Sequence, residues 1–267
     1  MIHEKWNLEI RGGKAALETY FLDTLQGNPD RKRPVVIICP GGGYEFLSDR
    51  ESEPIAVQMN ARGFHACVLK YSVKPASFPQ ALLELAKAVR LVRENAERWN
   101  ADPEKIIICG FSAGGHLACS MGTFWQEPWI AEELGGEKEL YRPDGLLLCY
   151  PVITSGALAH EGSIQNITGG DEKLRAKMSL ERQVTKDMPP VFLWHTYEDN
   201  TVPVENSLML AQSLCREKIP VELHIYPHGP HGLSLANEET GMPDGTGGIE
   251  PHCQGWVELA AQWVREL

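Results

Sequence analysis

A serine stands between two glycines in the segment 106–118, in the pattern Gly-x-Ser-x-Gly. An apolar run typical of a buried strand precedes this pattern, and a helix-compatible run follows it at once. The turn between such a strand and helix leaves no room for side chains at its glycines, and it exposes the serine hydroxyl above the sheet. The pattern therefore predicts that Ser112 is the nucleophile of an acyl-transfer reaction.

A serine hydroxyl needs a base that takes its proton and an acid that orients the base. In folds with this turn, the three groups follow in the chain order serine, acid, histidine, each after a different strand. Asp199 follows the strand expected at 191–195 and is the predicted acid. Its neighbour Glu198 is the competing acid, and a solvated loop carboxylate is the alternative role of Glu198.

The predicted base is His231, which follows the strand expected at 221–226. Its loop contains two prolines and two glycines, a composition that favours a stiff, irregular backbone able to hold an imidazole in place. His228 is the rival base. The His-x-x-His spacing also leaves a metal site as an alternative, although no acidic or cysteine cluster accompanies the pair. His195 ends the strand before Asp199, where it could line the site without being the base.

Backbone N–H groups are suited to hold the negative charge that develops on a carbonyl oxygen during attack, because their positions are set before the reaction. Ala113, directly after the serine, would supply one such group. The glycine-rich turn 39–44, after the strand expected at 34–39, would supply others. A phosphate-binding turn is the alternative, but no Lys-Ser or Lys-Thr pair follows these glycines.

The elements that must position these groups alternate between strands and helices. This alternation predicts an α/β fold, with a mostly parallel central sheet and helices on both faces. We expect strands at 6–10, 16–22, 34–39, 65–71, 106–109, 146–150, 191–195 and 221–226, and helices at 54–62, 80–99, 115–124, 204–218 and 256–265.

The chain of 267 residues is interpreted as a single α/β domain, 1–267, because it is long enough for one large core and short for two. Two stretches interrupt the alternation. The segment 155–190 is predicted to form a small cap-like insertion, and 237–251 is predicted to form a surface loop. Long insertions beyond the carboxyl ends of strands commonly shape the substrate pocket.

The formal net charge of −11 argues against nucleic acid and against an anionic membrane surface as partners. The seven cysteines form an odd set, and four of them lie in or beside apolar runs, so we expect reduced core residues. The amino terminus shows neither a signal-peptide core nor a membrane-spanning run, which predicts a cytoplasmic protein. The oligomeric state stays open between a monomer and a homo-oligomer.

Taken together, the motifs resemble the α/β-hydrolase superfamily, in particular its acetylesterase and xylan-esterase-like branch of carbohydrate esterases. The resemblance spans about residue 35 to the carboxyl terminus. The turn 40–44 is similar to the His-Gly-Gly-Gly loop of lipases and esterases, with Pro40 in place of the histidine. The other matching motifs are 71–73, 110–118, 150–153, His195-Thr196 with Asp199, Val202 and Pro203, and 227–232.

The resemblance implies a serine esterase that removes short acyl groups, in particular acetyl, from sugar hydroxyls or similar alcohols. Carried onto this chain, it implies Ser112 as nucleophile, His231 as base and Asp199 as orienting acid. It implies no metal and no organic cofactor, and a small-molecule or oligosaccharide ester as substrate. The oxyanion hole that it implies consists of Gly42, Gly43 and Ala113.

Two other functions share this fold. A peptidase of the prolyl-oligopeptidase type has the same three catalytic groups, although such enzymes usually carry a large extra domain. A non-catalytic binding protein is the second alternative, but here all three groups are present. Trp125, Trp129 and Tyr141 could stack on a sugar; the competing interpretation is packing at the end of the helix expected at 115–124.

Overall fold

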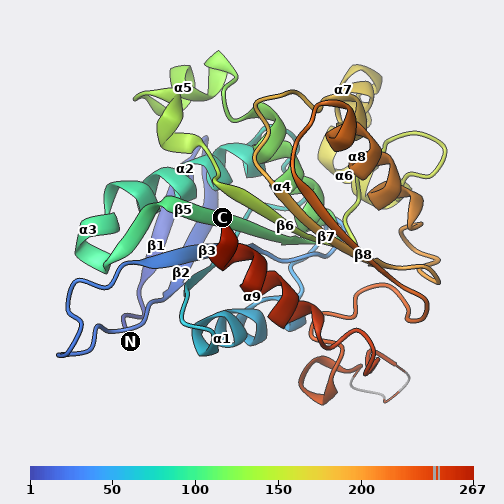
Figure 1. Ribbon diagram of the computed structural model, residues 1–267. Coiled ribbons are helices and arrows are strands. Elements are labelled where there is room, and N and C mark those ends of the chain that lie inside the picture. Colours follow the sequence, from blue (N-terminus) through green and yellow to red (C-terminus); the bar gives the residue numbers. More distant parts are fainter. Residues whose placement is uncertain (243–244, 246) are drawn as a thin grey trace.

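The computed structural model describes residues 1–242, 245 and 247–267, and these form one sheet flanked by helices (Figure 1). Its strands are β1 (Lys5–Ile10), β2 (Gly13–Tyr20), β3 (Arg33–Cys39), β4 (His65–Lys70), β5 (Ala101–Phe111), β6 (Gly145–Cys149), β7 (Val191–Thr196) and β8 (Val221–Tyr226). They follow the order β1-β2-β4-β3-β5-β6-β7-β8. β2 pairs antiparallel with β1 and with β4, whereas the strands from β4 to β8 pair in parallel.

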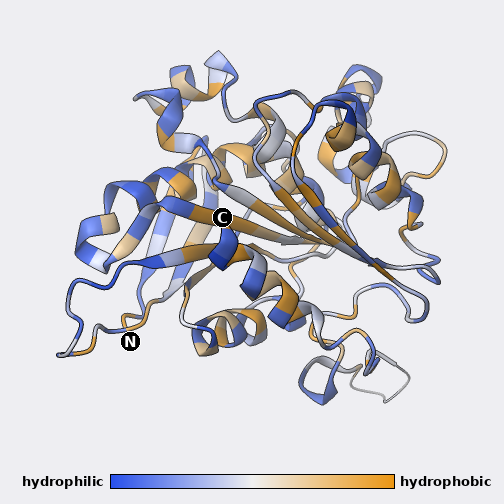
Figure 2. Ribbon diagram, in the orientation of Figure 1, coloured by the Kyte–Doolittle hydropathy of each residue, from blue (hydrophilic) through white to orange (hydrophobic). Residues whose placement is uncertain are grey.

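Helices cover both faces of this sheet (Figure 1). One face carries α2 (Gln80–Glu94), α3 (Ala96–Trp99), α4 (Ala113–Phe124), α5 (Pro128–Leu134) and α8 (Glu205–Arg216), and the other carries α1 (Glu53–Ala61) and α9 (Trp256–Glu266). Neighbouring residues of β3 point to opposite faces, as strand geometry requires. Val35 and Ile37 belong to the first core cluster, and Val36 and Ile38 to the second. The hydrophobic colouring along the central strands reflects this double burial (Figure 2). The predicted fold class is confirmed.

The structure divides the helix predicted at 80–99 into α2 and α3. Asn95 lies at the break, and its side-chain amide donates to the carbonyl of Leu91 at 2.9 Å. Asparagine side chains compete for backbone hydrogen bonds in this way and are poor helix formers for that reason. Asn100, with a left-handed φ of 50°, then ends α3. The prediction of one continuous helix is therefore wrong at Asn95.

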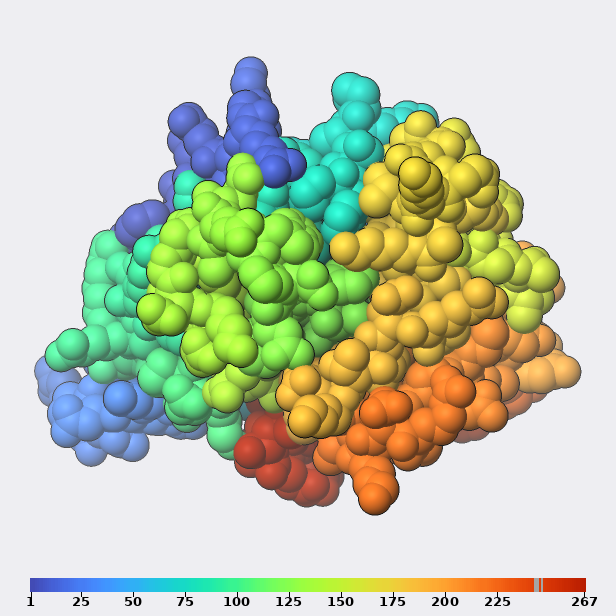
Figure 3. All heavy atoms as spheres, turned by 90° about the horizontal axis from the view of Figure 1, so that it is seen from above, coloured from blue at the N-terminus to red at the C-terminus, as the bar shows by residue number. Residues whose placement is uncertain are grey.

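The segment 155–190 contains α6 (Glu161–Thr168), α7 (Glu172–Lys177) and the short 3-10 helix η3 (Leu180–Arg182). Its yellow atoms lie between the green and orange parts of the chain when the molecule is seen from above (Figure 3). Ile164, Ile167, Met178 and Leu180 are buried in the same core cluster as Val35 of β3. The segment is thus packed onto the sheet's own core rather than around a core of its own.

The loop predicted at 237–251 includes positions 243, 244 and 246, which lie outside the described residues. Its described part contains the short 3-10 helix η4 (Glu238–Thr240). Arg50, in the 3-10 helix η1 (Asp49–Glu51), donates to the carbonyl of Thr240 at 2.7 Å and ties the two segments together. A further 3-10 helix, η2 (Lys138–Tyr141), follows α5. In the described part of the chain, we find no helix with the length and hydropathy needed to cross a membrane.

Candidate active site

Ser112 lies at the sharp turn between β5 and α4, with a left-handed φ of 53°. Such a conformation costs a non-glycine residue about 1–3 kcal/mol and persists only where the surroundings enforce it. The glycines on either side explain how the turn fits. A Cβ atom on Gly110 would lie 2.2 Å from the carbonyl oxygen of Gly114, and one on Gly114 would lie 2.0 Å from that of Cys39. The sequence motif is therefore a requirement for close backbone approach.

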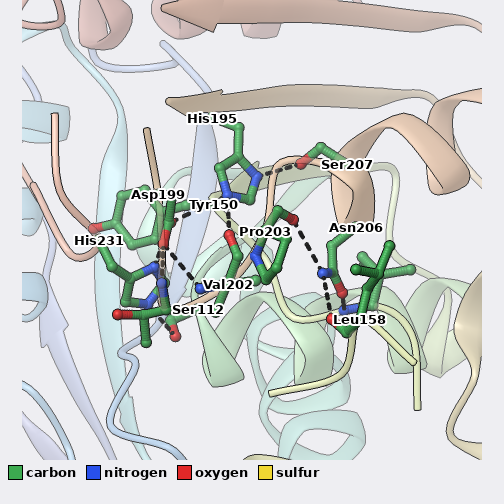
Figure 4. Close-up of polar contacts among 12 residues, drawn as sticks. Ser112, Tyr150, Leu158, His195, Asp199, Val202, Pro203, Asn206, Ser207 and His231 are labelled. Atoms are coloured by element: carbon green, nitrogen blue, oxygen red, sulfur yellow. Dashed lines mark hydrogen bonds and ion pairs between the residues drawn. The ribbon is translucent and has the colours of Figure 1, made fainter. Parts of the chain in front are cut away.

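The structure brings Ser112, His231 and Asp199 into one hydrogen-bonded chain (Figure 4). His231 Nε2 lies 2.8 Å from Ser112 Oγ, and His231 Nδ1 lies 2.6 Å from Asp199 Oδ2. An ionised carboxylate only accepts hydrogen bonds, so Nδ1 carries the proton and Nε2 is left as the acceptor for the serine hydroxyl. The three residues come from turns at the carboxyl ends of β5, β7 and β8.

Asp199 is fully enclosed and is held by several donors. Its Oδ1 accepts the N–H of Val202 at 2.9 Å, and its Oδ2 lies 3.2 Å from His195 Nε2. That same Nε2 donates to the carbonyl of Val202 at 2.9 Å, so His195 Nδ1 accepts from Ser207 Oγ at 2.7 Å. Burial alone would raise the pKa of Asp199, but the hydrogen bonds from His195 and His231 outweigh burial and hold that pKa well below its usual value. The acid is ionised throughout the neutral range.

The glycine turn after β3 faces the serine. Gly42 and Gly43 have positive φ angles of 125° and 65°, and a Cβ on Gly42 would lie 2.2 Å from the carbonyl oxygen of Phe46. Among the described residues, the N–H groups of Gly42, Gly43 and Ala113 have no hydrogen-bond acceptor. Gly41 differs, because its N–H donates to Glu51 at 2.8 Å. The N–H of Tyr44, the last residue of this turn, likewise has no acceptor among the described residues.

Two buried residues that sequence reasoning did not assign support this turn. Glu51 Oε2 accepts the N–H of Gly41, and its Oε1 accepts the hydroxyl of Tyr150 at 2.7 Å. The Tyr150 oxygen in turn accepts the N–H of Ser234 at 2.8 Å, and its ring lies 5.1 Å from that of His231. Tyr150 belongs to a motif noted in the sequence, whereas no local pattern marks Glu51.

The rival acid and base lie on the surface and bind each other. His228 Nδ1 is 3.0 Å from Glu198 Oε1, with side-chain exposures of 67% and 53%. His228 and His231 thus contact different carboxylates. The competing assignments of Glu198 and His228 receive no geometric support.

The aromatic residues considered for sugar stacking are largely packing residues. Tyr141 is fully buried, and Trp125 is nearly so, with its Nε1 donating to the carbonyl of Asp187 at 3.1 Å. Trp129 packs against Phe78, with ring centroids 5.9 Å apart. None of the three lines the cavity at Ser112 that the structure describes. This geometry favours the packing interpretation.

A cavity of about 740 Å³ opens at Ser112 and His231. The glycine turn after β3 forms one wall of the cavity. The apolar part of the cavity lining includes Phe46, Leu47 and Met242. The cap-like segment also reaches this cavity, through His160 at the start of α6. The cavity therefore combines apolar and charged side chains with one imidazole from the insertion.

His160 caps α6, and this role determines which ring nitrogen carries its proton. Its Nδ1 accepts the N–H of Ser163 at 3.3 Å and lies 2.8 Å from the Ser163 hydroxyl. Burial, and next the charge of His231, lower the pKa of His160, so the ring is neutral. A neutral ring with an accepting Nδ1 has its proton on Nε2, and that N–H has no acceptor among the described residues. Sequence reasoning missed His160; a histidine three positions before the helix's Ser163 is a weak N-cap signal.

Comparisons with known protein families agree with this architecture. The family described as BD-FAE matches residues 23–141, and the Prolyl oligopeptidase family matches residues 154–241. The chain is 40% identical over 224 residues to Endo-1,4-beta-xylanase B of Butyrivibrio fibrisolvens, covering 79% of this chain and 34% of that protein. It is 29% identical to an acetylxylan esterase of Xylanibacter ruminicola, covering 84% of this chain and 44% of that protein. It thus spans less than half the length of these two relatives.

Solved structures match over nearly the whole chain. The acetyl ester-xyloside bifunctional hydrolase of Caldicellulosiruptor lactoaceticus has a TM-score of 0.82 and 38% identity, covering 95% of this chain and 88% of that chain. The carboxylesterase Cest-2923 of Lactobacillus plantarum has a TM-score of 0.88 and 31% identity, covering 100% of this chain and 98% of that chain.

Proposed function

This chain belongs to the α/β-hydrolase superfamily, among its carboxylic ester hydrolases, and we propose that it is a serine esterase removing short acyl groups, above all acetyl, from sugar or small-alcohol hydroxyls. One observation carries the proposal: Ser112, His231 and Asp199 form a continuous hydrogen-bonded chain beside the free N–H groups of the glycine turn. The acetyl and sugar preferences are supported by similarity to proteins named acetylxylan esterase and acetyl ester-xyloside hydrolase. The cytoplasmic location expected from the sequence stays a prediction.

In the first half of the proposed reaction, Ser112 Oγ attacks the acyl carbon while His231 Nε2 takes the hydroxyl proton. The carbonyl oxygen of the ester becomes an oxyanion and receives hydrogen bonds from the N–H groups of Gly42, Gly43 and Ala113. The tetrahedral intermediate then collapses. His231 gives its proton to the leaving alcohol oxygen, and the acyl group stays on Ser112.

In the second half, His231 takes a proton from water, and the resulting nucleophile attacks the acyl-enzyme at the same carbonyl carbon. Collapse releases the carboxylic acid and returns the proton to Ser112 Oγ. Asp199 stays ionised throughout, because its depressed pKa resists protonation, and it stabilises the imidazolium form of His231.

The first test measures hydrolysis of a chromogenic acetyl ester by the purified chain. Ser112→Ala should lower kcat by about 10⁴- to 10⁶-fold, because the nucleophile is lost while binding groups remain. Circular dichroism checks that the variant is folded. Equal activity of wild type and Ser112→Ala would refute the serine mechanism.

An acyl-length series then tests the acetyl preference, and a peptide substrate tests the competing function. The match to the Prolyl oligopeptidase family covers Asp199 and His231, which esterases and peptidases of this fold share, so it leaves a peptidase as the second candidate. We expect kcat/KM to fall from acetate to octanoate. Higher kcat/KM for octanoate would reject the acetyl preference, and faster cleavage of a prolyl peptide than of any ester would favour the peptidase.

A further inference from the structure

A second cavity lies at the opposite end of the sheet from Ser112. It has a volume of about 290 Å³ and is formed by the start of β3, the end of α1, the start of β5 and the end of α9. Six cationic side chains line it, together with a single acid, Asp102. The cationic residues are Arg31, Lys32, Arg33, Arg62, Lys105 and Arg265. Such a concentration runs against the composition of the chain, whose net charge is −11.

Arg33, the first residue of β3, is the unusual member of this group. It is only 6% exposed, and its Nη1 donates to the carbonyl of Gly63 at 2.9 Å. Its buried Nε has no hydrogen-bond partner, and within the described residues no carboxylate forms an ion pair with Arg33. Buried guanidinium groups are normally paired, because removing an uncompensated charge from water costs several kcal/mol. The described part of the chain supplies no counterion for this charge.

Arg31 places a second positive charge close to Arg33. Its Nη2 lies 3.3 Å from the point where a Cβ on Gly63 would stand, and Arg33 Nη1 lies 3.5 Å from the same point. The two guanidinium groups therefore meet around Gly63, whose positive φ of 89° disfavours a side chain there. Burial, and next the charge of Arg31, lower the pKa of Arg33.

Ordinary roles account for part of the cationic set. Arg62 and Arg265 both contact Glu258, at 3.1 and 3.8 Å, and Lys105 Nζ donates to the carbonyl of Arg265 at 3.3 Å. Cations at the ends of α1 and α9 also complement the negative ends of those helices. Neither role extends to Arg33, which is buried at the start of a strand.

We propose that this cavity is an anion site that binds a tetrahedral oxyanion of the phosphate type, held by Arg33 and Arg31. A guanidinium group presents a planar fork of N–H donors that fits two oxygens of such an anion. The bound anion supplies the missing counterion through the outer N–H groups of Arg33 and Arg31, because the Nε of Arg33 is itself buried. Free phosphate and the phosphoryl group of a small metabolite present the same chemistry. The site is separate from the esterase centre and does not depend on the proposed reaction.

The test measures binding of inorganic phosphate to the full chain by calorimetry, and thermal unfolding in phosphate, chloride and acetate at equal ionic strength. Phosphate at ten times its Kd should raise the unfolding midpoint by about 3 °C over chloride and acetate. Titration with a sugar phosphate in parallel separates the two sources, because tighter binding of the sugar phosphate identifies a phosphorylated metabolite as the ligand.

Two substitutions and one matched control locate the binding. Arg33→Met should weaken phosphate binding at least tenfold and leave the midpoint in chloride unchanged or higher, because a buried unpaired charge is removed. Arg31→Ser, at an exposed position, should weaken binding without affecting folding. Lys186→Ser removes one exposed charge elsewhere and should bind phosphate like wild type.

Equal midpoints in phosphate, chloride and acetate would overturn the proposal, because they would show only ionic screening. Equal phosphate affinity of wild type, Arg33→Met and Arg31→Ser would also overturn it, since the anion would then bind elsewhere. Activity on an acetyl ester tests Ser112 independently, so failure of the anion site and failure of the esterase mechanism give different results.

Discussion

Buried charges are compensated differently at the two ends of the parallel strands, here called the carboxyl edge and the amino edge of the sheet. At the carboxyl edge, Asp199 accepts hydrogen bonds from two histidines and the N–H of Val202, and Glu51 accepts from Gly41 and Tyr150. At the amino edge, Arg33 donates to a backbone carbonyl but pairs with no carboxylate among the residues that the structure describes. The carboxyl edge is complete within the chain, as expected where dipoles must be fixed before a reaction. At the amino edge, the proposed anion would supply the missing negative charge.

The free donors at the carboxyl edge sharpen this contrast. In the proposed reaction, the N–H groups of Gly42, Gly43 and Ala113 receive a transient charge, and a neutral carbonyl oxygen can accept from them in the ground state. An unpaired N–H group is neutral and inexpensive in a cavity open to water. The unpaired charge of Arg33 is permanent and buried, so it needs a permanent partner.

After removal of the nucleophile itself, the largest expected effect comes from neutralising the acid at the carboxyl edge. Asp199→Asn should lower kcat for an acetyl ester by about 10³- to 10⁴-fold, because His231 loses the partner that fixes its tautomer and stabilises its cation. Steady-state kinetics measures the loss, and a urea transition checks the fold. The control Glu198→Gln changes an exposed carboxylate one residue away and should stay within about threefold of wild type. Comparable losses for both variants would contradict the assignment of Asp199.

Acidification should lower the free energy of unfolding, because a buried histidine at each edge resists protonation in the folded chain. Burial lowers the pKa of His116, at the carboxyl edge, and of His65, at the amino edge, to about 4 in each case. The unfolded chain binds these protons near pH 6.5, whereas the folded chain does not bind them until about pH 4. The stability that depends on neutral rings is therefore fully present above pH 6.5 and is lost as the pH falls toward 4, by up to about 3 kcal/mol for each histidine.

Urea unfolding at pH values from 7.5 to 4.5 measures this loss. His116→Gln should flatten the pH dependence by about half, because Gln can still accept from Tyr44 and donate to Met178 without titrating. An unchanged slope in this variant would show that His116 is not one of the groups responsible.

A pair of substitutions tests the contrast between the edges directly. Glu51→Gln should lower the free energy of unfolding by about 1–3 kcal/mol, because the amide cannot accept from both Gly41 and Tyr150. Arg33→Met, measured in chloride, should change it by less than about 1 kcal/mol or raise it. Similar destabilisation by both would mean that Arg33 is satisfied by the fold itself, and the contrast would be wrong.

Sequence reasoning reached the groups that stand directly after strands, and it missed those placed by long-range packing. Ser112 and Asp199 follow apolar strands and His231 follows the alternating strand β8, so local patterns together with the known chain order predicted them. Glu51 acquires its position through Tyr150, 99 residues away in the chain. His160 reaches the cavity only because α6 packs onto the core. No periodicity along the chain records contacts of this kind, because they depend on how the segment between them folds.

The smallest predicted effect concerns selectivity between alcohols, and it tests the Nε2–H of His160 as a donor to substrate hydroxyls. His160→Ser retains an N-cap for α6, because serine is a preferred capping residue, but it is too short to reach the cavity. The comparison uses a monoacetylated methyl xyloside and cyclohexyl acetate, which has a ring of similar size without hydroxyls. We expect kcat/KM to fall about tenfold further for the sugar ester, the effect of one lost hydrogen bond. Glu161→Gln, which breaks the exposed pair with Arg175 one residue along, should change both substrates by the same factor. An equal change for both substrates in His160→Ser would assign His160 a purely structural role. The cap-like segment would then shape the cavity without donating a hydrogen bond to the alcohol part of the substrate.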